Sequence, residues 1–570
     1  MTAKLGPAEL DIGVDGGIQH SLDPGKLVAM RRWILCIAIV NFDIDTGPIV
    51  DQMYPSASLD AGLKENIAFS SFPDASSAES RTEIHSFRVR HAAGGALETT
   101  TVQDGFMYGF AYFLQRRDQA LKRGFLQRSV VILTHLPYPS LFTVVISKLA
   151  PLYFEHGTAM LETACHNIAN WSAPHPGSTV EVGFLGGVYA VAIPQGPDDP
   201  QFIETSSFGV QFDAHQHILA SIPPLTTLPS SLQSPGSPTF TMAASQTPSI
   251  LSLCRSFLPS LWSIWECLIL CEPILVFAPS PSLSSVLIWW FRDFIRPLPL
   301  AFDFRPYFTI HDHDFPDFVP RAKMKGVATS KSAAYASPPK SGVVIGVTNP
   351  FFESACSHWP HVISLSAEVA APNAITKAQT MSRSTSHKGR ERGSVRSMLA
   401  PTDGPSKSRS MFDFSLSSLS HARTPPTSVQ SQQTHVGPAP GWYTKTHARY
   451  ISKDRAFIAQ LEAAVAKGGI AEVEGSWAIR QHFSNRTTAM LAPLNRYLTS
   501  LIPPAGKGAR LRPFNDADFF TSLETHGSAL TFRSSAKRRA FYERWMRTLA
   551  FGAWLAQAEE RIVGSGVLRQ

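Results

Sequence analysis

The chain of 570 residues lacks the short motifs that mark the common catalytic sites. It has no Gly-x-Ser-x-Gly elbow, no phosphate-binding loop, no His-Glu-x-x-His pair and no dinucleotide fingerprint. The nearest candidate, Gly183-Phe-Leu-Gly-Gly187, has the wrong spacing and is expected to open a strand rather than a helix. The sequence therefore predicts no conventional catalytic site.

Cysteine is scarce, and no Cys-x-x-Cys pair occurs. Most cysteines lie in apolar runs, which favours reduced thiols in the core of a cytosolic protein. Cys267 and Cys271 are four residues apart and could share one face of a helix. Because there is no second pair, we expect packing rather than metal binding and predict no metal site. The six cysteines are Cys36, Cys165, Cys254, Cys267, Cys271 and Cys356.

Long apolar runs without charge are also missing. The first run, residues 33–40, has only eight residues after a mixed leader, so we expect a buried strand and no signal peptide. The most membrane-like segment, residues 257–278, contains Glu266, Glu272 and Pro273. Buried acids are costly in hydrocarbon, so the sequence predicts no transmembrane segment.

The positive charge is concentrated in one polar segment. The whole chain has an excess of seven positive charges, and residues 377–409 alone hold eight lysines and arginines against Glu391 and Asp403. A nucleic-acid-binding protein usually carries its basic residues on a folded face, so no nucleic-acid partner is predicted. This segment could instead contact acidic lipid or acidic protein.

Length and composition predict several domains. A chain of 570 residues is too long for one core, and its apolar content of 44% is enough for several. Stretches rich in Ser, Thr and Pro separate the segments with regular periodicity. Two polar stretches, 223–249 and 323–341, are either genuine insertions or unremoved introns. The predicted parts are a loose N-terminus (1–31), a first module (32–195), a linker with a Ser/Pro-rich insertion (196–249), a central module with a polar insertion (250–370), a disordered basic linker (371–440) and a helical module (441–570).

Periodicity predicts a different structure for each module. Short loops between strands favour an antiparallel sheet in the first module, and alternating helical and β-rich runs favour an α/β structure in the central one. In the first module we expect strands at 33–40, 49–54, 83–90, 107–115 and 125–134 and helices at 59–70, 141–156 and 159–171. In the central module we expect helical or β-rich runs at 251–270, 274–278, 284–295 and 343–348. In the last module we expect helices at 455–467, 477–483 and 488–501, then two more after residues 512–519, with Asn515 or Asp516 as a cap.

Several runs, in this order along the chain, resemble one protein family. Asn41-Phe-Asp-Ile-Asp-Thr-Gly-Pro-Ile-Val-Asp-Gln-Met-Tyr-Pro55 and Ser70-Ser-Phe-Pro-Asp74 come first. Glu272-Pro-Ile-Leu-Val-Phe-Ala-Pro-Ser-Pro281, Phe302-Asp-Phe-Arg-Pro-Tyr-Phe-Thr-Ile-His-Asp-His-Asp-Phe315 and Gly346-Val-Thr-Asn-Pro-Phe-Phe352 follow. Together they are similar to the AVL9-like branch of the tripartite DENN domain family, which includes DENN domain-containing protein six. The resemblance covers about residues 32–195, 250–370 and 440–550.

The resemblance implies an α/β plus α fold. A longin-type antiparallel sheet with helices would pack on a central α/β module, and a helical module would follow. It also implies a guanine nucleotide exchange factor for a Rab-family GTPase, cytoplasmic and recruited to endosomal or secretory membranes. No cofactor is implied, because an exchange factor makes no covalent bond: it favours the nucleotide-free GTPase and by linkage weakens nucleotide binding.

Partner-binding residues are expected where aromatic residues lie beside polar ones. Aromatic side chains often anchor interfaces, although most of these would equally suit a core. Asp303 and Arg305 are two residues apart on one side of a strand and could pair with each other or contact a partner. The candidates are Phe42, Asp43, Asp45, Tyr54, Pro55, Phe72, Pro73, Asp74, Asp303 and Arg305, of which Asp43, Asp45, Pro55, Pro73 and Asp74 are expected to be exposed.

Two further interpretations concern single motifs. His311-Asp-His-Asp314 could suggest a metal, but in an extended run neither face offers three ligands, so polar turn residues are expected. Lys122-Arg-Gly-Phe125 is similar to a motif of folliculin-type proteins, in which the arginine speeds GTP hydrolysis by a partner. Arg123 could therefore serve a GTPase-activating protein, while a structural turn at Gly124 is the alternative. A scaffold that binds a Rab without exchange activity also remains open.

Overall fold

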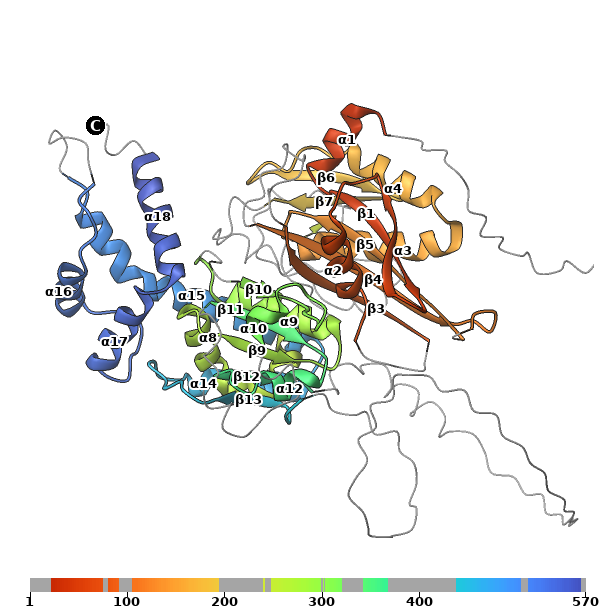
Figure 1. Ribbon diagram of the computed structural model, residues 1–570. Coiled ribbons are helices and arrows are strands. Elements are labelled where there is room, and N and C mark those ends of the chain that lie inside the picture. Colours follow the sequence, from red (N-terminus) through yellow and green to blue (C-terminus); the bar gives the residue numbers. More distant parts are fainter. Residues whose placement is uncertain are drawn as a thin grey trace, which may run out of the picture. The chain divides into compact units, whose positions relative to one another are not determined.

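The computed structural model describes residues 22–74, 80–91, 105–122, 124–193, 239–240, 248–298, 301, 303–319, 342–366, 437–503 and 511–564 (Figure 1). Several sequence-based predictions concern residues outside these ranges. They are most of the insertion at 223–249, the insertion at 323–341, the basic linker as far as residue 436, and Arg123.

The first module begins with a helix and a five-stranded sheet. Helix α1 (Pro24–Arg31) lies within the part expected to be loose, where Asp23 caps it and Met30 is buried. All neighbouring strands are antiparallel, in the order β2-β1-β5-β4-β3. The strands are β1 (Cys36–Asp43), β2 (Gly47–Tyr54), β3 (Arg81–Arg90), β4 (Phe106–Arg117) and β5 (Phe125–Thr134), and the helices are α2 (Ala61–Ser70), α3 (Pro139–His156) and α4 (Ala159–Ala169). The predicted order of elements is confirmed.

Both faces of this sheet are covered at its centre, which explains why residues 36–40 of β1 and 130–133 of β5 are apolar throughout rather than alternating. Successive side chains of a strand point to opposite faces. Ile37 and Ile39 of β1 join the core formed with α3 and α4, while Cys36 and Ala38 join the core formed with α2.

A small hairpin follows the first sheet. Strands β6 (Thr179–Phe184) and β7 (Gly187–Ala192) pair antiparallel, and Leu185 and Gly186 between them have φ values of 45° and 81°. Positive φ at both turn positions matches the right-handed twist of a hairpin. Strand β8 (Thr239–Phe240) runs parallel to β7. The prediction that residues 183–187 open a strand is confirmed.

The central sheet has the order β10-β11-β9-β12-β13. Its first four strands are parallel and β13 is antiparallel to β12. Every residue of β9 and β11 is buried, as expected for parallel strands covered on both faces. The strands are β9 (Ile274–Phe277), β10 (Asp303–Arg305), β11 (Val343–Val347), β12 (His361–Ser364) and β13 (Gly441–Thr444); the helices are α7 (Ile250–Cys254), the 3-10 helix η2 (Arg255–Ser260), α8 (Leu261–Ile269), α9 (Pro281–Phe294), α10 (Phe315–Phe318) and α12 (Phe351–Ala355).

The apolar segment 257–278 is part of this core. It forms η2, α8 and β9, and the side chains of Trp262 and Trp265 are fully buried within it. Among the described residues, no helix is long and apolar enough to cross a membrane.

Five helices form the rest of the described chain: α14 (Arg455–Lys467), α15 (Ile470–Ser500), α16 (Asp516–His526), α17 (Ser535–Trp545) and α18 (Leu549–Gly564) (Figure 1). Asn515 caps α16 by accepting a hydrogen bond from the Asp518 amide, as predicted.

Two predictions about this region were wrong. The two helices expected at 477–483 and 488–501 are one helix, α15, because the polar residues between them do not interrupt it. Thr487 is buried, donates to the Phe483 carbonyl and accepts from the Trp265 indole at 3.0 Å. In addition, three helices follow residue 512 instead of two.

Candidate functional site

The first candidate site is the contact between β3 of the first sheet and β10 of the central sheet. Its six charged residues are Arg88, Arg90, Asp303, Arg305, Asp312 and Asp314, called here the arginine–aspartate cluster. Arg90 Nε lies 2.7 Å from Asp314 Oδ2, and Arg305 Nε lies 2.7 Å from Asp303 Oδ1. Three guanidinium groups face three carboxylates, so the cluster is balanced in charge.

Burial makes the pairs of Arg88 and Arg305 structural, whereas the Arg90 side chain is 53% exposed. The side chain of Arg305 is fully buried, and the Arg88 guanidinium lies 3.6 Å from the centre of the Phe106 ring. Burial would raise the pKa of Asp303, but the guanidinium groups of Arg305 and Arg88 hold it below its usual value. Of the two roles left open for Asp303 and Arg305, the structure therefore supports mutual pairing.

The residues 311–314 form a turn, as expected from their polar character. Asp312 Oδ1 accepts a hydrogen bond from the Asp314 amide at 2.9 Å. His311 stacks on Phe69 of α2 with ring centres 3.9 Å apart. The two aspartates face Arg305 rather than the histidines, so the motif does not assemble a metal site.

Next to the cluster, side chains of the first module reach the carboxyl ends of the central parallel strands. Tyr307, just after β10, accepts a hydrogen bond from the Asp74 amide at 2.9 Å and donates to the Phe72 carbonyl. Glu83 of β3 accepts from the Ser282 amide in the first turn of α9. Open α/β sheets commonly bind ligands at this edge. In this protein the segments that carry Asp74 and Glu83 occupy that edge of the central sheet.

Burial dominates the electrostatics of both acids. It raises the pKa of Asp74 to about 6, against the lowering effect of hydrogen bonds from Asn349 and Tyr307. Asp74 Oδ2 is buried and finds no hydrogen-bond partner among the described residues. Burial also raises the pKa of Glu83. These carboxylates belong to the contact between the modules.

Apart from Asp303 and Arg305, the predicted partner-binding residues separate into two groups. Phe42 and Phe72 are in ring contact at 6.3 Å, near the turn that joins β1 to β2. Tyr54 pairs with Ile37 at the opposite end of the same hairpin, with Pro55 next to it. The structure thus brings together Phe42, Asp43, Asp45, Phe72, Pro73 and Asp74, and places Tyr54 and Pro55 elsewhere.

Exposure within these groups also differs from expectation. Asp45 is exposed, but Asp43, Pro55, Pro73 and Asp74 are half-buried, so the expected exposure of these four was wrong. Asp74 is covered because the end of α2 folds against Tyr307. Asp43 Oδ1 accepts three hydrogen bonds from Asp45 and Thr46, which lower its pKa and stabilise the turn. A partner-binding role for these residues stays a prediction.

A group of exposed apolar residues near the same turn was not predicted from the sequence. Ile44 is 61% exposed, Ile49 41% and Ile310 36%. Phe69 of α2 connects the hairpin to the loop after β10, because a side chain at Gly47 would begin 3.6 Å from its ring, and His311, next to Ile310 in the chain, stacks on its face. We call Ile44, Ile49, Phe69, Ile310 and His311 the hairpin surface. The one feature of the sequence that could have predicted this surface is Ile44, which lies between Asp43 and Asp45 at a turn.

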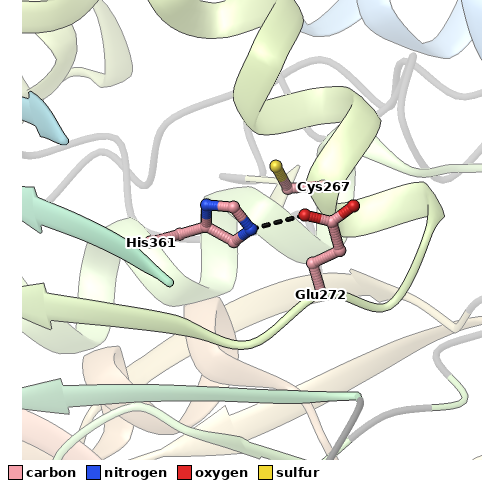
Figure 2. A group of neighbouring side chains, drawn as sticks. All are labelled: Cys267, Glu272 and His361. Atoms are coloured by element: carbon pink, nitrogen blue, oxygen red, sulfur yellow. Dashed lines mark hydrogen bonds and ion pairs between the residues drawn. The ribbon is translucent and has the colours of Figure 1, made fainter. Parts of the chain in front are cut away.

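A second group of reactive side chains lies within the central module. Figure 2 shows Cys267 of α8 and His361 of β12 around Glu272, with donor atoms of all three within 4.8 Å of one another. His361 Nε2 hydrogen-bonds one carboxylate oxygen of Glu272, and Arg544 of α17 lies 2.9 Å from the other as an ion pair without hydrogen-bond alignment.

These contacts favour a role in holding separate segments of the chain together over a role as a metal centre. Burial raises the pKa of the Cys267 thiol well above its usual value, and the Glu272 carboxylate raises it further. One oxygen of Glu272 already bonds His361 and the other already pairs with Arg544, so both ligand atoms of this acid are engaged within the chain. Nearby, Glu266 accepts the amides of Tyr450 and Ile451 and contacts His447 Nε2 at 2.7 Å. The two acids thus attach residues 444–451 and α17 to the central module.

Comparison with known proteins agrees with the motifs along the chain. No protein-family model matches the chain. The mouse protein DENND6A is 29% identical over 543 residues, covering 92% of this chain and 76% of its own length. The human protein DENND6B is 28% identical, covering 93% and 80%, and a DENND6 homologue from Dictyostelium discoideum is 27% identical, covering 94% and 72%.

The chain therefore belongs to the DENN domain family. Within that family it is similar to the DENND6 proteins of mammals, chicken and Dictyostelium along nearly its whole length.

Proposed function

We propose that this protein is a guanine nucleotide exchange factor for a Rab-family GTPase in endosomal or secretory traffic. The observation that carries the proposal is the similarity to DENND6 proteins over more than nine-tenths of the chain. We further propose that residues 32–195 form the longin module, 250–370 the central DENN module and 441–570 the helical module. The β2-β1-β5-β4-β3 sheet with helices on both faces supports the first of these assignments.

Nucleotide exchange requires shape and charge rather than bond chemistry. A protein that binds the empty GTPase more tightly than the loaded one must weaken nucleotide binding by the same factor. The arginine–aspartate cluster joins β3 to β10, and the Phe69–His311 stack joins α2 to the loop after β10. Both contacts hold the hairpin surface in one shape, and we propose that this surface receives the GTPase.

The exposed isoleucines support this location. Large exposed apolar residues flanked by acids are typical of interfaces, where an apolar centre is surrounded by a polar rim. Ile44 lies between Asp43 and Asp45 at the tip of the turn. Asp43 serves this site by shaping the turn.

One assay distinguishes exchange from its alternatives. Release of fluorescent GDP and hydrolysis of GTP are measured for a panel of Rab proteins with the full chain. An exchange factor accelerates release for at least one Rab, a scaffold binds without changing either rate, and an activating protein accelerates hydrolysis. The activating-protein alternative would replace this proposal if the chain accelerates GTP hydrolysis without accelerating GDP release, and if Arg123→Ala abolishes that acceleration. The turn at Gly124, with φ of 73°, agrees with a structural role for its tripeptide.

A further inference from the structure

The described part of the chain carries a second concentration of positive charge, in addition to that of residues 377–409. Residues 445–455 and 531–548 hold ten lysines and arginines against Asp454 and Glu543. Their local excess of eight is larger than the excess of seven for the whole chain. Positive charge outside residues 377–409 is therefore unevenly distributed along the chain.

The structure places these two segments side by side. Ile451 and Phe532 form an antiparallel bridge, and the Arg533 amide donates to the Tyr450 carbonyl at 3.0 Å. Lys537 lies over the Tyr450 ring at 5.4 Å, and Arg544 Nη1 donates to the Tyr450 hydroxyl at 3.3 Å. Two basic segments that are about eighty residues apart in sequence thus form one surface.

Few of these cations have an acidic partner. Arg544 pairs with Glu272, and Arg539 pairs with Glu524 and Glu543. Among the described residues, no ion pair involves the other eight. Burial lowers the pKa of Lys453, and the positive charge of Arg449 lowers it further. We call the ten residues the basic face: Lys445, Arg449, Lys453, Arg455, Arg533, Lys537, Arg538, Arg539, Arg544 and Arg547.

An exposed apolar side chain adjoins this charge. Leu549, the first residue of α18, is 65% exposed and follows Arg547 by two residues. The nearby aromatic side chains of Phe541, Tyr542 and Trp545 are buried, so they offer no platform on which nucleic-acid bases could stack. Basic residues around an exposed leucine are instead the combination that adsorbs to lipid headgroups and inserts shallowly between them.

We propose that the basic face binds an anionic membrane surface, with Leu549 entering the headgroup layer. The attraction follows from charge complementarity, since each lysine or arginine near an anionic leaflet contributes to adsorption and salt weakens it. The inference does not depend on exchange activity. Binding to vesicles and release of GDP are separate measurements, so either can fail alone.

The test is co-sedimentation of the full chain with phosphatidylcholine vesicles, with and without about one-third phosphatidylserine. Arg533→Glu/Arg547→Glu is expected to weaken binding to anionic vesicles by at least about tenfold. Arg116→Glu/Arg117→Glu is the matched control, because both residues are exposed and lie on β4. Leu549→Ser should reduce binding less than the double charge reversal does.

A second variant keeps the test independent of folding. Arg455 is exposed at the first position of α14, where a glutamate is favourable to the helix. Arg455→Glu should therefore weaken vesicle binding without lowering the melting temperature. Equal binding to neutral vesicles, or full binding by both basic-face variants, would overturn the proposal. So would binding that is lost only when the basic residues of 377–409 are neutralised, or binding to poly-glutamate but not to vesicles.

Discussion

Arginine has opposite surroundings in two regions of this molecule. In the arginine–aspartate cluster, three arginines face three aspartates, and the Arg305 side chain is fully buried. On the basic face, Arg533 and Arg547 are exposed and take part in no ion pair among the described residues. The first set joins two sheets, whereas the second leaves its charge available to a partner. Local charge balance, rather than residue type, separates structural from binding arginines.

Replacing Arg305 should give the largest effect on stability. Arg305→Leu leaves Asp303, Asp312 and Asp314 without their shared partner, and breaking a buried pair costs about 3–5 kcal/mol. The free energy of unfolding from urea denaturation measures the loss. Arg533→Gln is the matched control and should change it by less than about 0.5 kcal/mol. Similar losses for the two variants would erase the distinction between the regions.

Glu272→Gln should have the next largest effect. The substitution removes a charge that His361 and Arg544 both contact in a buried position, which is worth roughly 1.5–3 kcal/mol. The same urea experiment measures it. Because Arg544 belongs to the basic face, this variant also tests whether α17 is held to the central module. An unchanged midpoint of urea denaturation would mean that the contacts of Glu272 with His361 and Arg544 contribute nothing to stability.

Asp74→Asn should stabilise the protein, and only at neutral pH. The folded-state pKa of about 6 is above the usual value of 3.8, so ionising Asp74 costs stability as pH rises from about 4 to above 6. The variant avoids this cost, which is roughly 1–2 kcal/mol after allowance for partial exposure. Melting temperatures of the two proteins at pH 7.5 and pH 4 measure the difference. A variant that is less stable at pH 7.5 would assign Asp74 a favourable charged contact.

Deleting residues 371–434 should have the smallest effect. The segment is polar and aperiodic, so it is expected to bury little apolar area. The deletion stops before residue 437 because Ser364 Oγ donates to the Pro438 carbonyl and Gly437, with φ of 84°, lies against Phe277. The melting temperature should stay within a degree or two, measured by circular dichroism. Loss of cooperative unfolding would show that the segment is part of the fold.

Much of the fold could be predicted from the sequence, because local patterns determine it. Apolar periodicity located all five strands of the first sheet. The spacing of two between Asp303 and Arg305 allowed either their pairing or contact with a partner, and the structure shows the pairing. Where local pattern and tertiary packing disagreed, packing decided: the polar residues before Thr487 stay helical because that side chain is held by Trp265.

The candidate sites were less predictable, because they depend on contacts between distant segments. Nothing near Asp74 indicates that Tyr307 covers it, 233 residues away. Arg449 and Arg533 belong to short basic runs whose adjacency depends on the bridge between Ile451 and Phe532. The function proposed for the protein follows from motifs whose order along the chain matches a known family. The proposed place of GTPase binding follows instead from the exposed isoleucine side chains, which only the structure reveals.

The most direct test of the central claim compares the hairpin surface with another exposed apolar position. Fluorescent-GDP release from the cognate Rab is measured with the wild-type chain, with Ile44→Glu, and with Val188→Glu as the control, since Val188 is 55% exposed on β7. Burying a charge in an apolar contact should slow stimulated release at least about tenfold for Ile44→Glu and leave Val188→Glu unchanged. If no Rab releases GDP faster, or if Ile44→Glu stimulates release as well as the wild type, the account is contradicted.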